Sequence, residues 1–358
     1  MAPAPADRFI EPLGLLEGPA AFSSVRDGLA LPLQGGQAAF ALARLIEDGT
    51  DRGIHLVQAI PEEWQDLLPA LTRRLPPFAG IEPSQPGMPL VMGILNVTPD
   101  SFSGDGLAAD TAAAIARGHA MLEAGADILD IGGESTRPGA EPVTPAEEIR
   151  RILPVVRDLA RAAPVSVDTR HAATMAAALE AGAEIINDVT ALRHDGAALS
   201  VVQAAAAPLI LMHMPGTEPR SMQAAAQYAD VVLEVARFLR DRVATLEQLG
   251  IPRGRIAIDP GIGFGKTMAH NLALLERLPL LAGLGCHLLL GLSRKRFLGR
   301  IAGIPEAGAR MVPSVAGALY AAARGATILR VHDVAETVQA LALWRAAASG
   351  AAPPDVTV

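Results

Sequence analysis

The sequence predicts an α/β protein, a (β/α)8 TIM barrel with a small N-terminal α/β extension. Eight short apolar runs recur along the chain, and most stretches between them have helical periodicity, which indicates parallel βαβ units. The chain is also 50% hydrophobic but only 3% aromatic, and branched aliphatic residues fill barrel interiors. The runs are Leu90–Leu95, Ile128–Ile131, Val165–Val167, Glu184–Ile186, Leu209–Met212, Ile256–Ile258, Leu288–Leu290 and Thr327–Val331.

A polar cluster stands at or just after the end of each run. Because the loops that follow the strands of a TIM barrel build its active site on one face, we expect these clusters to meet there. In chain order they are Asn96–Asp100, Gly132–Arg137, Asp168–Thr169, Asn187–Asp188, His213–Met214, Asp259–Gly261, Ser293–Lys295 and His332–Asp333.

The 358 residues of the chain exceed the roughly 250 of a typical barrel. We therefore predict two parts, a barrel over 86–350 and an N-terminal extension over 1–85, to which the sequence assigns no role. Within the extension, Gln37–Glu47 is predicted as a short helix and Ile54–Val57 as a strand. The Pro- and Gly-rich stretch Leu75–Pro89 is predicted as the linker between the two parts.

Two helices of the barrel have clear start or stop signals. Thr144 is a candidate cap, with Pro145 at the first helical position and Glu147 placed to close a capping box. Pro154 predicts a kink in the same helix. The stretch Asp230–Leu249 is amphipathic and stops at Gly250, which is typical of a helix end.

Composition excludes several classes of function. A net charge of −8 does not favour nucleic-acid binding. The single cysteine, Cys286, excludes an internal disulfide and fits a reducing compartment. No secretory signal or span of about 18 apolar residues is evident, so we expect a soluble cytoplasmic protein without membrane contact. Glycine-rich 261–266 resembles a phosphate-binding loop, but the required first glycine is Pro260.

Eight motifs, in order over roughly residues 90–345, resemble those of the dihydropteroate synthase family. The resemblance implies a pterin-binding transferase of folate biosynthesis. Such an enzyme condenses 6-hydroxymethyl-7,8-dihydropterin pyrophosphate with p-aminobenzoate, giving 7,8-dihydropteroate and pyrophosphate by dissociative substitution. The motifs occupy residues 93–103, 130–139, 166–169, 186–189, 211–214, 259–266, 293–295 and 330–334.

A reduced pterin has an amidine-like edge of N–H donors, and a carboxylate at a strand end can accept two of them. By resemblance, Asp168 also stabilises the positive charge that develops as pyrophosphate leaves, and Asp168, Lys295 and Arg137 are the catalytic residues. His213 is interpreted as a structural wall of the same pocket. The pterin-binding residues that the resemblance implies are Asp168, Asn187, Asp259, Lys295, Met212, Phe264 and Gly291.

A pyrophosphate leaving group needs its charge neutralised, and the planar fork of arginine suits this. Mg²⁺ prefers oxygen ligands and keeps several waters. By resemblance the cofactor is Mg²⁺, with Asn96 as its protein ligand. The pyrophosphate-binding residues implied in the same way are Asn96, Thr136, Arg137, Arg330 and His332.

The p-aminobenzoate carboxylate needs donors, and its ring needs an apolar wall. By resemblance, Thr136, Pro138, Phe264, Arg294 and Lys295 surround it. Many family members have a serine where this chain has Arg296, which leaves open how the carboxylate and sulfonamides are held. The loops at 100–106 and 135–139 are rich in glycine and polar residues and are predicted to close over substrate.

Two alternatives stay open beside this function. A pterin-binding methyltransferase domain shares the barrel but has no pyrophosphate to bind, so Arg330 and Lys295 argue against it. A catalytically silent pterin-binding protein would bind ligand without forming product. The family usually dimerises through late helices of the barrel, and the small, apolar stretch Met311–Leu319 fits a homodimer.

Overall fold

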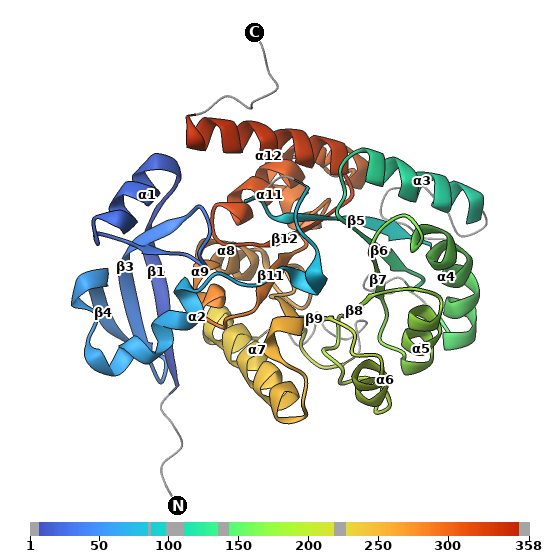
Figure 1. Ribbon diagram of the computed structural model, residues 1–358, viewed down its shortest axis with the longest axis horizontal. Coiled ribbons are helices and arrows are strands. Elements are labelled where there is room, and N and C mark those ends of the chain that lie inside the picture. Colours follow the sequence, from blue (N-terminus) through green and yellow to red (C-terminus); the bar gives the residue numbers. More distant parts are fainter. Residues whose placement is uncertain (1–6, 85–86, 98–110, 135–142, 218–226, 351–358) are drawn as a thin grey trace, which may run out of the picture.

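The computed structural model describes residues 7–84, 87–97, 111–134, 143–217 and 227–350. Eight parallel strands close into a barrel, each hydrogen-bonded to its neighbours in chain order, and the last pairs with the first (Figure 1). Every strand overlaps one of the apolar runs, so the predicted fold class is confirmed. The strands are β5 (Leu90–Asn96), β6 (Ile128–Gly132), β7 (Val165–Asp168), β8 (Ile185–Asp188), β9 (Leu209–Met212), β10 (Ile256–Asp259), β11 (His287–Leu290) and β12 (Ile328–Val331).

Helices surround the barrel, and their capping explains where two of them begin. The Thr144 hydroxyl accepts a hydrogen bond from the Glu147 amide at 3.3 Å, while the Glu147 carboxylate binds Arg150 and Arg151. Asp230 caps α7 in the same manner. The helices are α3 (Thr111–Glu123), α4 (Pro145–Leu159), α5 (Ala172–Glu180), α6 (Ala198–Ala204), α7 (Val231–Gln248), α8 (Met268–Glu276), α9 (Pro279–Ala282), α10 (Arg296–Ala302), α11 (Met311–Ala322) and α12 (Val334–Ser349).

The N-terminal extension is a small antiparallel sheet beside the barrel (Figure 1). The predicted helix over Gln37–Glu47 is wrong, because Ala39–Glu47 forms the strand to which the other three pair. The predicted strand at Ile54–Val57 overlaps β4. The elements are β1 (Arg8–Leu16), α1 (Gly18–Arg26), β2 (Leu31–Pro32), β3 (Ala39–Glu47), β4 (Thr50–Leu56) and α2 (Leu68–Thr72).

Buried polar contacts join the extension to the barrel. The Glu11 carboxylate on β1 is 1% exposed and accepts two hydrogen bonds from Arg277, each of 3.0 Å. Arg44 on β3 supplies a third at 3.2 Å. The Gln34 amide donates to the carbonyls of Ala282 and Cys286 beneath α9. The sheet is therefore anchored on the α8–α9 side of the barrel.

The stretch predicted as a linker lies against the bottom of the barrel. Phe78 is 1% exposed and packs among the first inward-facing residues of the strands. His287 at the start of β11 lies 2.8 Å from the Pro76 carbonyl. Phe78 therefore closes the end of the barrel where the strands begin. Its partners are Leu90, Met92, Ile128, Ile185, Ile210, Ala257, Leu289 and Ile328.

We expect Phe78→Ala to lower the free energy of unfolding by about 3–5 kcal/mol, because it removes a large side chain from a closed apolar site. Urea denaturation measures the change. The control is Phe22→Ala on α1, where the side chain is 62% exposed, and its effect should stay within about 0.5 kcal/mol. Equal effects of the two variants would show that Phe78 does not close the core.

No helix in the described part of the chain is long and apolar enough to cross a membrane.

Candidate active site

The alternation of side chains along each strand places the polar residues at the barrel mouth. Side chains two residues beyond the apolar bottom layer face the same interior, one layer nearer the mouth. At that level the sequence changes from apolar to polar on several strands. The steps are Ile128 to Asp130, Ile185 to Asn187, Ala257 to Asp259 and Ile328 to Arg330.

Strand register brings further predicted residues into one row. Asn96 pairs with Gly132, Gly132 with Asp168, and Asp168 with Asn187. Gly132 carries no side chain, and a Cβ there would stand 3.6 Å from the Asp168 Cβ and 3.8 Å from the Asn96 Oδ1. The side chains of Asn96 and Asp168 thus border the same small space at the mouth.

Arg330 joins two carboxylates at the centre of the mouth. Its Nε donates to Asp130 Oδ2 at 2.5 Å, and its Nη2 donates to Asp168 Oδ2 at 2.9 Å. Asn187 donates to the same Asp130 oxygen at 3.1 Å. No role is predicted for Asp130 from the sequence, although a charged residue inside an apolar run is a signal, because such residues are rarely buried unless paired.

Asp168 is held near the balance between its charged and neutral forms. Burial raises its pKa to about 7, and the negative charges of Asp130, Glu148 and Asp188 add to the effect, while Arg330 opposes it. The carboxyl remains 15% exposed, so it borders the open mouth. A group with this pKa can change charge when a cationic or anionic ligand arrives.

Asp259 ends β10 and orients the loop after it. Its Oδ1 accepts a hydrogen bond of 2.7 Å from the Gly261 amide. Gly261 has φ +67°, and a Cβ there would lie 2.0 Å from the His213 carbonyl oxygen, so this turn requires glycine. Burial raises the pKa of Asp259, and the charges of Lys295, Arg330 and Lys266 act in the opposite direction.

Lys295 faces the loop that begins at Asp259. Its ammonium donates to the Ile262 carbonyl and stands 4.7 Å from the centre of the Phe264 ring. Burial lowers the pKa of Lys295 to about 8, although Asp259 partly offsets the effect. Phe264 also packs in an apolar cluster with Val189, Met212 and Met214, so Met212 and Phe264, both predicted site residues, form one wall.

The segments after β11 and β12 meet beside this wall. Arg294 has φ +59°, uncommon for a residue other than glycine. Its amide donates to the Ser314 hydroxyl at 2.8 Å, and its guanidinium donates to Asp333 at 2.5 and 3.2 Å. His332 lies against the Ser293 hydroxyl at 3.0 Å. Arg296 is exposed at the start of α10.

Gly291 lies directly beyond β11 and is buried. A Cβ there would stand 3.9 Å from the Arg330 Cβ, so the predicted position borders the Arg330 side chain. Thr136, Arg137 and Pro138 lie outside the described residues, as do the predicted loops at 100–106 and 135–139.

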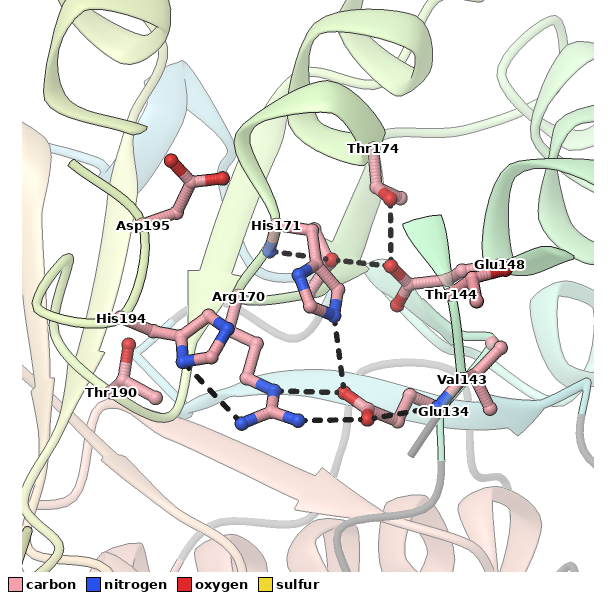
Figure 2. Close-up of polar contacts among 12 residues, drawn as sticks. Glu134, Val143, Thr144, Glu148, Arg170, His171, Thr174, Thr190, His194 and Asp195 are labelled. Carbon is pink, nitrogen blue, oxygen red and sulfur yellow. Dashed lines mark hydrogen bonds and ion pairs between the residues drawn. The ribbon is translucent and has the colours of Figure 1, made fainter. Parts of the chain in front are cut away.

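A buried polar network lies just beyond the ends of β6 and β7 (Figure 2). Glu134 accepts two hydrogen bonds of 3.0 Å from Arg170 and one of 3.4 Å from the Val143 amide. Glu148, fully buried on α4, accepts hydrogen bonds from the hydroxyls of Thr169 and Thr174, and burial raises its pKa to about 7. The sequence analysis assigned no role to these carboxylates, because nothing in the spacing of residues 134, 148 and 170 brings them together.

The described residues contain no group of three or more His, Cys, Asp or Glu side chains that could hold a metal ion. Asn96, half-buried at the end of β5, offers one amide oxygen toward the space above Gly132.

A family model described as "Pterin binding enzyme" matches residues 92–332. Dihydropteroate synthase of Neisseria meningitidis serogroup C is 49% identical over 262 residues, which are 72% of this chain and 92% of that protein.

Two solved structures of Xanthomonas albilineans dihydropteroate synthase are also similar. The one with 4-aminobenzoic acid has a TM-score of 0.68 and 51% identity, covering 74% of this chain and 94% of that chain. The one in complex with 7,8-dihydropteroate has a TM-score of 0.63 and 47% identity over the same shares.

Proposed function

The chain belongs to the dihydropteroate synthase family of pterin-binding enzymes, and from that premise we propose how its barrel mouth carries out the reaction. The enzyme is a transferase of folate biosynthesis that joins a dihydropterin pyrophosphate to p-aminobenzoate. The observation that carries the assignment of roles is the polar layer in which Asp168, Asn187 and Asp259 end three strands of one barrel.

The pterin ring lies on this polar layer. The carboxylates of Asp168 and Asp259 and the amide of Asn187 match its donor edge, and Lys295 reaches its carbonyl and ring nitrogen. Met212 and Phe264 cover its apolar faces, and the absence of a side chain at Gly291 leaves room beside Arg330. The support is geometric: the Lys295 ammonium already finds a carbonyl acceptor at Ile262 and the Phe264 ring.

Asp168 then acts as bond cleavage begins. Loss of pyrophosphate leaves positive charge on the pterin, and an ionised carboxylate preorganised beside it stabilises that charge. The neutral amine of p-aminobenzoate attacks the resulting cation and forms the new C–N bond, and the nitrogen then loses one proton to the released pyrophosphate or to water. No covalent bond to the protein is needed, so positioning and electrostatics supply the catalysis.

Pyrophosphate is held by Asn96, Thr136, Arg137, Arg330 and His332. Arg330 is already paired with Asp130 and Asp168, so an anion of several charges needs further positive charge. Mg²⁺ fits that need, because it takes one or two protein oxygens and completes its shell with waters and phosphate. When bound, it supplies charge neutralisation at the leaving group, with Asn96 as its protein ligand.

The p-aminobenzoate site lies outside the pterin, with Phe264 as its wall and Thr136, Pro138, Arg294 and Lys295 around it. In the described structure the Arg294 guanidinium is engaged by Asp333. It therefore acts through its backbone or after exchanging this partner. Arg296, exposed at the start of α10, is the nearest additional cation along the chain.

The enzyme is a homodimer that pairs through α11 and α12. Large apolar side chains are exposed on both helices, namely Val312, Tyr320 and Leu343, and α11 is otherwise rich in small residues. A cytoplasmic location agrees with Cys286, a free and buried thiol.

The test is product formation by the purified protein, given the pterin pyrophosphate, p-aminobenzoate and Mg²⁺, with and without a chelator. We expect 7,8-dihydropteroate and pyrophosphate in equal amounts, and loss of turnover with the chelator. Pterin binding without product would favour the catalytically silent binder. Methyl transfer from a methylated folate would favour the methyltransferase.

A further inference from the structure

Lys266 is a buried cation in the mouth for which the proposed reaction has no use. Its side chain, 5% exposed, follows the loop that begins at Asp259. The ammonium lies 3.0 Å from His213 Nδ1, 3.3 Å from the His213 carbonyl and 3.0 Å from the Phe264 carbonyl. An ammonium has three N–H donors, and these three acceptors use all of them.

The contact with Lys266 fixes the state of His213. Nδ1 must accept a hydrogen bond, so the ring carries its proton on Nε2. Burial and the nearby charges of Lys266 and Arg193 together lower the pKa of His213 to about 2, so the ring is neutral. It lies edge-on to Phe238, with ring centres 5.0 Å apart. His213 is thus a fixed acceptor rather than a proton carrier.

The loop between Asp259 and Lys266 carries the groups that face Lys295. The His213 amide donates to the Asp259 carbonyl at 2.9 Å, and Gly261 lies directly against the His213 carbonyl. Ile262 supplies the carbonyl that Lys295 contacts, and Phe264 supplies the ring beside it. Lys266 therefore ties the far end of this loop to the end of β9.

We propose that Lys266 is a positioning residue of the pterin pocket, which pins the Ile262–Phe264 segment to His213 and, when protonated, places a positive charge behind Asp259. This inference rests on the proposed role of Asp259 in pterin binding. Lys266 itself touches no substrate, since its three donors all face protein acceptors.

The charges around Asp259 set its pKa and therefore the pH dependence of pterin binding. Asp259 faces Lys295, Arg330 and Lys266, while Lys266 faces Asp259, Lys295 and His213. Burial lowers the pKa of Lys266 to about 7, although the charge of Asp259 opposes the shift, so Lys266 carries its positive charge mainly below that pH. Asp259 must be ionised to accept the donor edge of the pterin. Removing one of its cations disfavours the ionised form and raises its pKa. Pterin affinity then falls, and the loss extends to higher pH.

The experiment compares wild type with Lys266→Met, a side chain of similar length without donors or charge. Binding of the pterin pyrophosphate is measured by calorimetry from pH 5.5 to 9. We expect affinity about tenfold weaker on the acid side of pH 7, where Lys266 is protonated in wild type, and an Asp259-dependent acid limb displaced upward by about one pH unit. Lys266 does not face Asp168, so the fall in affinity due to that residue should stay near pH 7.

Two further variants separate this role from a packing defect. His213→Asn retains a polar partner for Lys266 and leaves the charge in place, so it should weaken binding without moving the acid limb. Arg300→Met removes an exposed cation of α10 and should change neither quantity. If Lys266→Met does not fold, Lys266→Ala with added methylammonium makes the same test, because an amine in the vacated site should restore affinity.

An unmoved acid limb in folded Lys266→Met, or no restoration of Lys266→Ala by the amine, would overturn the inference. Wild-type product formation distinguishes this failure from a wrong function. If wild type forms dihydropteroate but the acid limb of pterin binding is unmoved in Lys266→Met, only the role of Lys266 is rejected. If wild type forms no product, both the proposed function and the role of Lys266 are rejected.

Discussion

Asp168→Asn should lower the kcat of dihydropteroate formation by about 10²–10³-fold, the usual cost of removing one preorganised electrostatic partner of a transition state. The amide keeps the shape of the carboxyl and its place beside Arg330, so pterin binding should weaken less than turnover. Steady-state kinetics with both substrates saturating separates the two effects.

The pH dependence of wild type checks the same residue independently. Because the pKa of Asp168 is raised to about 7, the carboxyl is neutral below that pH and ionised above it. Reaction requires the ionised form, so kcat/KM should fall as the pH drops through about 7. This limb should be absent from Asp168→Asn. The control is Asp241→Asn on α7, whose side chain is 68% exposed. It should keep both the wild-type kcat and the fall of kcat/KM near pH 7. An equal loss of activity in this control would refute a specific role of Asp168.

Arg277→Met should lower the free energy of unfolding by about 3–5 kcal/mol, because it leaves the buried Glu11 carboxylate with only its hydrogen bond from Arg44 and removes the partner of Asp230 at the start of α7. The Glu11 carboxylate would lose two of its three guanidinium hydrogen bonds while remaining buried. Urea denaturation followed by circular dichroism measures the change, and activity of the folded fraction should be unaltered because Arg277 lies outside the mouth.

The matched control is Arg150→Met, whose partner Glu147 forms a surface pair on α4 with the arginine 71% exposed. Its effect should be below about 1 kcal/mol. The double variant Glu11→Leu with Arg277→Leu should recover most of the stability, since a buried pair replaced by apolar residues is often neutral. If Arg277→Met lowers the free energy of unfolding no more than Arg150→Met does, the pair of Glu11 and Arg277 does not anchor the extension.

The barrel could be predicted from sequence because its signal is local and repeated. Each strand overlaps an apolar run, and the change from apolar to polar residues along the sequence marks the strand end. The extension lacked such repetition. Gln37–Glu47 is rich in Ala and Leu, which favour helix, yet β3 lies between β1 on one side and β2 and β4 on the other. Tertiary pairing outweighed the intrinsic preference of these residues.

The candidate site shows the same division. Asn187, Asp259 and Arg330 stand at strand ends, where spacing alone predicts an inward direction. The roles of Asp130 and Lys266 could not be predicted, because they depend on partners that are distant in the sequence. Asp130 pairs with Arg330, 200 residues away, and Lys266 contacts His213, 53 residues away. A single sequence does not encode such pairings in its spacing.

Phe78 closes the bottom of the barrel, and this has a kinetic consequence. Substrates reach the polar layer through the mouth, and in the proposed function p-aminobenzoate binds outside the pterin. A molecule of p-aminobenzoate that arrived early would stand in the path of the pterin. On the proposed assignment of the site residues, we therefore expect an order of addition, with the pterin substrate first and p-aminobenzoate second, and release of the joined product through the same mouth.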